Sequence, residues 1–147
     1  MDQLIVKDVI EIAAPAKNVW RMLTDPALTK RYMFGCAAVT DWKVGSPLEW
    51  AATVDGKDIV YVKGTVLAVE PERLLSYTTI GVGPEYEDRP DNYLTVTCRL
   101  TPVDGKTRLE ITQGDYARVS DGKKRYDDTV GNWGSVLQQM KAVAESL

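Results

Sequence analysis

The chain has 147 residues, of which 18 are basic and 21 acidic, so its net charge is −3. At this length we expect one domain over residues 1–147, and the lack of a basic excess argues against nucleic-acid binding, because phosphate contacts need surplus positive charge. Histidine is absent, which excludes Ser-His-Asp and Cys-His catalysis and leaves too few ligands for a zinc site.

The N-terminal segment carries no recognisable targeting signal. It lacks a basic start followed by a long apolar run, so we expect no signal peptide. No stretch approaches the ~20 apolar residues that a membrane-spanning helix needs. Two cysteines, Cys36 and Cys98, are too few for a disulfide framework and favour reduced thiols. These features predict a cytoplasmic protein without a membrane span.

One strand and two short helices are predicted at the start of the chain. Residues 4–12 are rich in isoleucine and valine and favour a strand. Pro15 suits the first turn of a helix, and the apolar side chains within residues 19–23 follow at helical spacing. The Thr-Asp-Pro sequence of residues 24–26 ends that helix and can cap a second one, which we expect to end around residues 32–35.

Six strands are predicted next. Their ranges are 36–42, 47–54, 58–69, 74–80, 93–101 and 106–113. Asp55-Gly56 and Asp104-Gly105 are hairpin signals, because both central residues of such a turn need positive φ. Hairpin connections make the strands antiparallel. Residues 81–92 and 114–125 are polar loops, and we expect them to gate a cavity.

Residues 126–147 predict one long amphipathic helix. Its apolar stripe consists of Trp133, Leu137, Met140, Ala144 and Leu147. Such a helix would span about 30 Å, enough to cross a sheet. Because the antiparallel sheet is the only partner that can bury this stripe, the sequence indicates an α+β fold with a curved sheet wrapped around the terminal helix. This arrangement tends to leave a cavity between sheet and helix.

An ordered set of residues carries a family resemblance over nearly the whole chain. The set is Ile12, Ala14-Pro15, Val19-Trp20, Leu23-Thr24-Asp25-Pro26, Tyr32, Asp41-Trp42, Val44-Gly45, Trp50, Gly64, Val66, Glu70-Pro71, Leu74, Thr107-Arg108-Leu109 and Trp133. It resembles the family of activators of the heat-shock-protein-90 ATPase homologues, within the START-like (SRPBCC, helix-grip) superfamily.

The resemblance implies a helix-grip fold. In that fold a curved antiparallel sheet of about seven strands surrounds the C-terminal helix, two short helices after the first strand plug one end, and an apolar cavity lies inside. Relatives bind lipids, hormones or polyketides, a few catalyse cyclisation, and some assist a chaperone, so function depends on the site. Many relatives have histidine where this chain has Gln113, which argues against a role that needs a titrating imidazole there.

The candidate ligand-binding residues lie on the expected inward faces and near the loops. They are Tyr32, Trp50, Val62, Tyr77, Val96, Ile111, Gln113, Tyr126, Trp133 and Leu137. We expect Tyr32 and Tyr126 at the rim, where an apolar ring with a polar tip is useful. The amide of Gln113 falls on an apolar face and must find a ligand, a water or a neighbouring side chain as partner.

Glycines and charges near these residues allow two interpretations each. Gly131 and Gly134 beside Trp133 indicate either close backbone approach or room for a ligand on the one hand, or tight packing on a strand on the other. Asp127 and Asp128 suit a helix start, and the basic residues 123–125 would either attract an anion or offset those acids. The acidic loop containing Glu85, Glu87, Asp88 and Asp91 favours a solvated lid.

The sequence favours binding of a small apolar or amphipathic molecule over catalysis. A chaperone-assisting interaction protein is the second hypothesis, and a cyclase- or hydratase-like enzyme in the same cavity is the third. No catalytic residue, metal site or cofactor is indicated by a motif. We expect a monomer or a homodimer.

Overall fold

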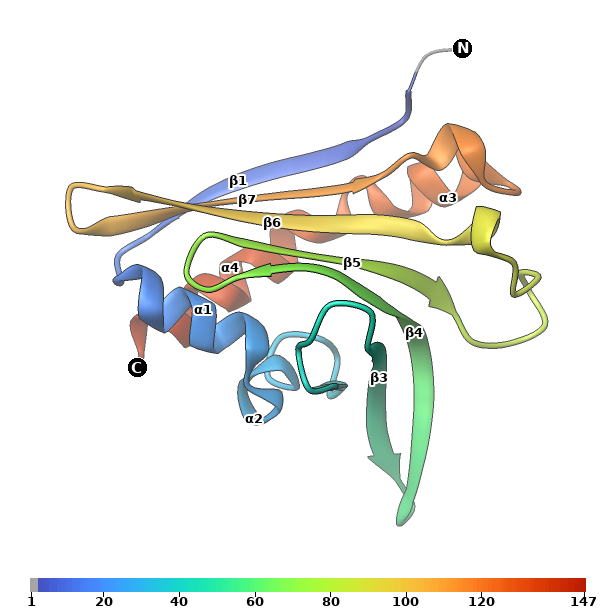
Figure 1. Ribbon diagram of the computed structural model, residues 1–147, viewed down its shortest axis with the longest axis horizontal. Coiled ribbons are helices and arrows are strands. Elements are labelled where there is room, and N and C mark those ends of the chain that lie inside the picture. Colours follow the sequence, from blue (N-terminus) through green and yellow to red (C-terminus); the bar gives the residue numbers. More distant parts are fainter. Residues whose placement is uncertain (1–2) are drawn as a thin grey trace.

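The computed structural model describes residues 3–147, which form a curved antiparallel sheet with helices on one side (Figure 1). The strand order is β1-β7-β6-β5-β4-β3-β2. The strands are β1 Val6–Ile12, β2 Ala37–Val39, β3 Pro47–Val54, β4 Lys57–Glu70, β5 Leu74–Gly81, β6 Leu94–Val103 and β7 Lys106–Gly114. The helices are α1 Ala16–Thr24, α2 Pro26–Thr29, α3 Gly122–Thr129 and α4 Asn132–Glu145, with short 3-10 turns η1 Pro90–Asn92 and η2 Tyr116–Arg118. The predicted α+β class with seven antiparallel strands is confirmed.

Both predicted hairpin turns are present. Asp55 and Gly56 join β3 to β4 with φ values of 52° and 78°. Asp104 and Gly105 join β6 to β7 with φ values of 50° and 80°. Aspartate tolerates this region and glycine has no Cβ to clash, so each pair suits a tight turn between twisted strands.

The sheet bends sharply along β4. Two β-bulges each place one extra residue on β4, Tyr61 opposite the step from Trp50 to Ala51 of β3 and Leu67 opposite the step from Ser76 to Tyr77 of β5. Gly64 lies in the bend, where an added Cβ would stand 1.6 Å from the carbonyl oxygen of Thr78 on β5. Bulges increase local bending and glycine permits the close backbone approach. As a result, the β3–β4 hairpin projects away from the other strands (Figure 1).

The hydrophobic core lies between the sheet and α4. The buried residues of α4 are Trp133, Val136, Leu137, Met140, Val143 and Ala144. They share one core with alternate residues of β6 and β7, including Val96, Cys98, Leu100, Leu109 and Ile111. The two short helices close one end of this core, and Val19 and Met22 of α1 are completely buried there.

The prediction of one helix over residues 126–147 is wrong in its start and its continuity. Helix α3 already begins at Gly122, and α4 begins only at Asn132. Gly122 lies so close to η2 that a Cβ would stand 1.7 Å from the carbonyl oxygen of Tyr116. The interruption falls at Val130 and Gly131. The apolar period continues across it, so the pattern alone gives no sign of two segments.

Two further interpretations of this region are corrected. Asp127 and Asp128 lie in the last turn of α3 rather than at a helix start, and they form ion pairs with Lys123 and Lys124. No atom lies within 4 Å of a Cβ built on Gly131 or on Gly134, within the described residues. Tight packing on a strand therefore does not explain either glycine.

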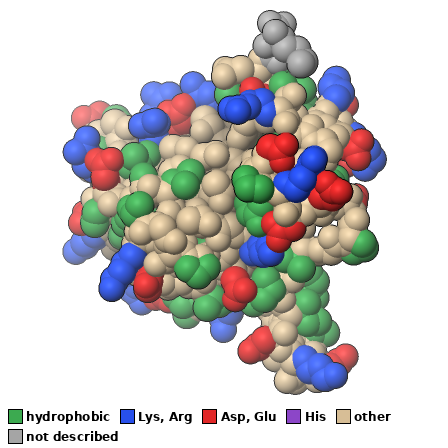
Figure 2. All heavy atoms as spheres, turned by 45° about the vertical axis from the view of Figure 1, so that its right-hand side comes forward, with side chains coloured by type: hydrophobic (Ala, Val, Ile, Leu, Met, Phe, Trp, Pro, Cys, Tyr) green, Lys and Arg blue, Asp and Glu red, His purple; other side chains and the backbone are tan. Residues whose placement is uncertain are grey.

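Exposed apolar side chains follow the projecting hairpin. Figure 2 shows hydrophobic side chains along this protrusion, with charged groups at its tip. Val54, Ile59 and Tyr61 of β3 and β4 are exposed, as is Phe34, which precedes β2 and is 85% accessible. Among the helices of residues 3–147, none combines the length and hydrophobicity required to cross a bilayer.

Candidate functional site

A cavity of about 680 Å³ lies between the bent part of the sheet and helices α3 and α4. Its lining residues are Met33, Phe34, Cys36, Trp50, Ala52, Val54, Tyr61, Val62, Tyr77, Thr79, Ile80, Gly81, Tyr86, Leu94, Val96, Gln113, Tyr116, Arg125, Asp128, Thr129, Asn132, Trp133 and Val136. Sites for small molecules commonly measure about 300–1,000 Å³. The bend in β4 therefore opens a space of the size that a small molecule needs.

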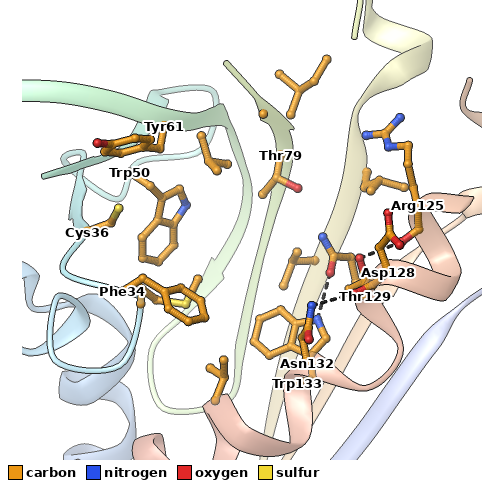
Figure 3. A pocket seen from close by; sticks show the side chains of 18 of the residues that line it. Phe34, Cys36, Trp50, Tyr61, Thr79, Arg125, Asp128, Thr129, Asn132 and Trp133 are labelled. Carbon is orange, nitrogen blue, oxygen red and sulfur yellow. Dashed lines mark hydrogen bonds between the residues drawn. The ribbon is translucent and has the colours of Figure 1, made fainter. Parts of the chain in front are cut away.

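One end of the cavity is aromatic and apolar. Figure 3 shows Phe34, Cys36, Trp50 and Tyr61 at this end. The rings of Trp50 and Tyr77 are 6.0 Å apart between centroids. Phe34 and Tyr61 are exposed, so this end opens to solvent. Burial raises the pKa of the Cys36 thiol, which favours its neutral form.

The opposite end is polar and is supplied by the C-terminal helices. Arg125, Asp128 and Thr129 come from α3, and Asn132 begins α4 (Figure 3). Thr129 donates its hydroxyl hydrogen to the Arg125 carbonyl oxygen at 2.8 Å, and the Asn132 amide donates to the Asp128 carbonyl oxygen at 2.7 Å. These bonds satisfy helix carbonyls at the interruption between α3 and α4.

Gln113 and Trp133 join the sheet to α4 within the cavity wall. The indole Nε1–H donates to the Gln113 Oε1 at 2.9 Å. The partner of this amide is thus a neighbouring side chain, one of the three expected options. The bond fixes the indole ring on the first turn of α4.

Arg125 connects α3 to the two loops above the cavity. Its guanidinium donates to the carbonyl oxygens of Ser120 and Asn92, both at 3.4 Å, and lies 4.1 Å from the centre of the Tyr86 ring. The Asn92 Oδ1 accepts from the backbone amide and the hydroxyl of Ser120 at 3.0 and 2.9 Å. The loops around residues 82–92 and 115–121 are therefore fastened to each other.

The structure brings six of the ten predicted residues together around the cavity. They are Trp50, Val62, Tyr77, Val96, Gln113 and Trp133. Burial raises the pKa of Tyr77 well above its usual value, so its phenol stays neutral. Their role in ligand binding stays a prediction.

The other four residues do not line this cavity. Tyr32 is only 1% exposed and donates its hydroxyl hydrogen to the Met22 carbonyl oxygen at 3.0 Å, so its predicted place at the rim is wrong. Ile111 and Leu137 are buried in the solid core. Tyr126 packs edge-on against Tyr116, with 5.8 Å between the ring centres.

The prediction missed most of the polar end. Arg125, Asp128, Thr129, Asn132 and Val136 recur at intervals of three and four residues and form one stripe with Trp133. This helical periodicity is visible in the sequence. Because residues 114–125 were expected to form a loop, Arg125 was not counted as part of the helix, and the stripe was not recognised. Phe34 and Tyr61 carry no comparable signal.

Most of the chain matches one known protein family. The profile of the family described as "Activator of Hsp90 ATPase homolog 1-like protein" matches residues 13–145. The chain belongs to this family. The resemblance identified from the sequence is thereby confirmed. No protein of curated function matches the chain significantly in sequence.

Solved structures agree with membership of the Hsp90 ATPase activator homologue family. The solution structure of ChR145 from Cytophaga hutchinsonii is 33% identical, with a TM-score of 0.75 over 99% of this chain and 97% of that one. The Aha1 dimer from Colwellia psychrerythraea is 16% identical, with a TM-score of 0.70 and 96% coverage of both chains. DynU16, encoded in the dynemicin biosynthetic locus, is 19% identical with a TM-score of 0.74, over 99% of this chain and 48% of that one. The latter two likenesses establish the fold only.

Proposed function

We propose that this protein binds a small amphipathic molecule in the cavity between the sheet and helices α3 and α4. The observation that carries the proposal is a cavity of about 680 Å³ with an aromatic end at Trp50 and a polar end at Arg125. An apolar body would gain roughly 25 cal/mol for each Å² of apolar surface removed from water, before ordering costs. The polar end would orient it.

The walls of the cavity support binding because they are already formed. Trp133 is held by Gln113, and the two loops above the cavity are fastened through Asn92. No fully buried side-chain nitrogen or oxygen within residues 3–147 lacks a hydrogen-bond partner. A ligand would therefore enter a site whose polar groups are in place, with little reorganisation to oppose binding.

The first prediction tests whether the cavity is the binding site. Ala52 of β3 lines the cavity, whereas the adjacent Ala51 does not. Because tryptophan at position 52 would fill part of the space, Ala52→Trp should weaken binding of the uncharged fluorescent probe N-phenyl-1-naphthylamine at least tenfold. Ala51→Trp adds the same side chain outside the cavity and is the matched control. Fluorescence titration measures both affinities, and circular dichroism verifies folding.

Two outcomes would contradict the proposal. In the first, the wild-type protein does not bind the probe at all. In the second, folded Ala52→Trp binds as well as the wild type does. Native mass spectrometry of the purified protein, followed by extraction of any retained molecule, would then show whether a ligand occupies another part of the fold.

The chaperone-assisting function is a second candidate, and one observation favours it. The β3–β4 hairpin presents Val54, Ile59 and Tyr61 to solvent beside the exposed Phe34. Exposed apolar groups clustered in this way are typical of interaction surfaces. A pull-down of the Hsp90 chaperone with measurement of its ATPase rate tests this function. An unchanged rate with no retained chaperone would exclude it.

A further inference from the structure

The polar end of the cavity contains a buried cation that has no carboxylate partner within residues 3–147. Arg125 is only 7% exposed, and none of the ion pairs of the described chain includes it. Its two hydrogen bonds, to the carbonyl oxygens of Ser120 and Asn92, are long at 3.4 Å each. A guanidinium has five N–H donors, so three find no acceptor in the described chain. Since no fully buried side-chain nitrogen among residues 3–147 lacks a partner, the Nε–H, which makes neither bond, is open to the cavity or to solvent.

A buried positive charge of this kind is unfavourable unless another group compensates it. Moving a charge out of water costs several kcal/mol, and two neutral carbonyls with one aromatic ring offset only part of that. Because Arg125 also lines the cavity, a ligand in the cavity can reach the donors that the protein leaves unused.

The neighbouring charged groups do not supply the missing counter-charge. Asp128 lines the same end, but its carboxylate pairs with Lys124 at 3.2 Å. Glu85 forms no ion pair with Arg125 among the described residues. Thr129 already donates its hydroxyl hydrogen to a helix carbonyl. Arg125 is therefore the charged donor that remains at this end.

We propose that the ligand carries a single carboxylate, which Arg125 binds, while its apolar body extends toward Trp50 and Phe34. This inference rests on the proposed binding function and defines the class of ligand. A planar guanidinium matches the two oxygens of a carboxylate and forms charge-assisted bonds with them. One guanidinium balances one negative charge. A doubly charged phosphate would leave one charge unbalanced beside the carboxylate of Asp128.

The experiment uses three competitors with the same ten-carbon chain and different head groups. Decanoate, decan-1-ol and decyltrimethylammonium are each titrated against N-phenyl-1-naphthylamine bound to the wild-type protein, and the loss of probe fluorescence measures displacement. Decanoate should displace the probe at a concentration at least tenfold lower than decan-1-ol. Decyltrimethylammonium should be the weakest competitor, because its charge has the same sign as that of Arg125.

Three variants separate recognition of the carboxylate from a structural role. Arg125→Gln should abolish the preference for decanoate over decan-1-ol, measured as the ratio of the two affinities, so that any general loss of binding cancels. Arg125→Lys keeps the positive charge but loses the planar pair of N–H donors that matches a carboxylate. It should retain part of the preference for decanoate over decan-1-ol. Arg118→Gln removes an exposed cation of η2 that does not line the cavity. This control should behave as the wild type does.

The possible failures can be told apart. If the wild type binds the probe but shows no preference for decanoate, the carboxylate inference is wrong and the binding function stands. The same conclusion follows if Arg125→Gln weakens decanoate and decan-1-ol equally, since Arg125 would then only hold the loops together. If the wild type binds no probe, the proposed function itself fails.

Discussion

At the scale of single residues, the bond between Gln113 and Trp133 shows how one polar pair fixes the cavity wall. The indole is 8% exposed, and its only hydrogen-bond donor reaches the Gln113 amide at 2.9 Å. A buried donor that loses its partner is costly, because it gave up water on folding. The pair therefore holds the first turn of α4 against β7.

The second prediction removes this bond. Gln113→Leu should lower the free energy of unfolding by about 1–3 kcal/mol, because the Trp133 indole N–H loses its acceptor. Urea denaturation measures the change. Trp133→Phe removes the indole N–H that Gln113→Leu would leave without an acceptor. In the Trp133→Phe background, Gln113→Leu should therefore lower the free energy of unfolding by less than it does in the wild type. Equal costs in both backgrounds would show that the bond contributes nothing.

At the scale of elements, the bend in β4 determines whether the sheet can form a cavity. Gly64 permits it, since β5 approaches so closely that no other residue fits beside the Thr78 carbonyl. The atoms in contact belong to the backbone of β5 and cannot rotate away, unlike a flexible side chain. The bulges on either side let β3 and β4 leave the plane of the other strands.

The third prediction compares two glycines. Gly64→Ala should destabilise the fold by about 3 kcal/mol or more, because the methyl group forces β4 and β5 apart. Gly134→Ala places the same methyl group on α4 where no atom lies within 4 Å. It should stabilise the protein by about 0.5–1 kcal/mol, since alanine favours a helix. Thermal or urea unfolding distinguishes the two. A mild effect of Gly64→Ala would mean that the sheet adapts easily.

The elements themselves could be predicted well where the local signal is strong. Strands β3 and β7 and both Asp-Gly turns lie where alternation and turn chemistry place them. The break between α3 and α4 could not be predicted, because apolar residues keep helical spacing across residues 130–131. The start of α3 could not be predicted either, because it lies at the contact of Gly122 with the carbonyl of Tyr116, which only the folded chain forms.

At the scale of the whole molecule, hydrogen bonds tie distant parts of the chain together. The Asp115 carboxylate accepts from the Leu4 amide and the Ala117 amide, both at 2.9 Å. Both bonds lower the pKa of Asp115 below its ordinary value of 3.8, and the bond from Leu4 has the larger effect. At the C-terminal end of α4, Glu145 accepts from the Ala13 amide at 2.8 Å. The sheet edge and the last helix are thus joined to the start of the chain.

The fourth prediction concerns pH. Because the pKa of Asp115 is lower in the folded state, its contribution to stability is present above the unfolded pKa and is lost as the pH falls through the folded pKa. The variant Asp115→Asn keeps an oxygen acceptor at this position but has no group there that titrates. The stability gap between wild type and Asp115→Asn should therefore be largest at neutral pH and shrink below about pH 4.

Urea denaturation at several pH values measures this gap. Asp104→Asn removes one carboxylate at the β6–β7 turn, where it accepts no hydrogen bond from residues 3–147, and controls for the loss of surface charge. A gap for Asp115→Asn that stays constant from neutral to acidic pH would contradict the prediction.

The sequence by itself determined the class of fold and the family. Alternation and turn residues depend only on neighbours in the chain, so they define antiparallel strands and show which side of each strand faces inward. It also placed Trp50, Val96 and Trp133 on those inward sides. A periodic pattern does not determine the distance between the sheet and the helices that pack on it.

That separation was decided only by the tertiary structure. Ile111 and Leu137 face inward as Val96 does, yet they lie in solid core, whereas Val96 borders the cavity. The difference arises from the bend in β4, which lifts one end of the sheet off the helices. Arg125 became part of the site because α3 begins earlier than its sequence pattern indicated. The face of a residue is a local property, but the space in front of it depends on how two distant layers diverge.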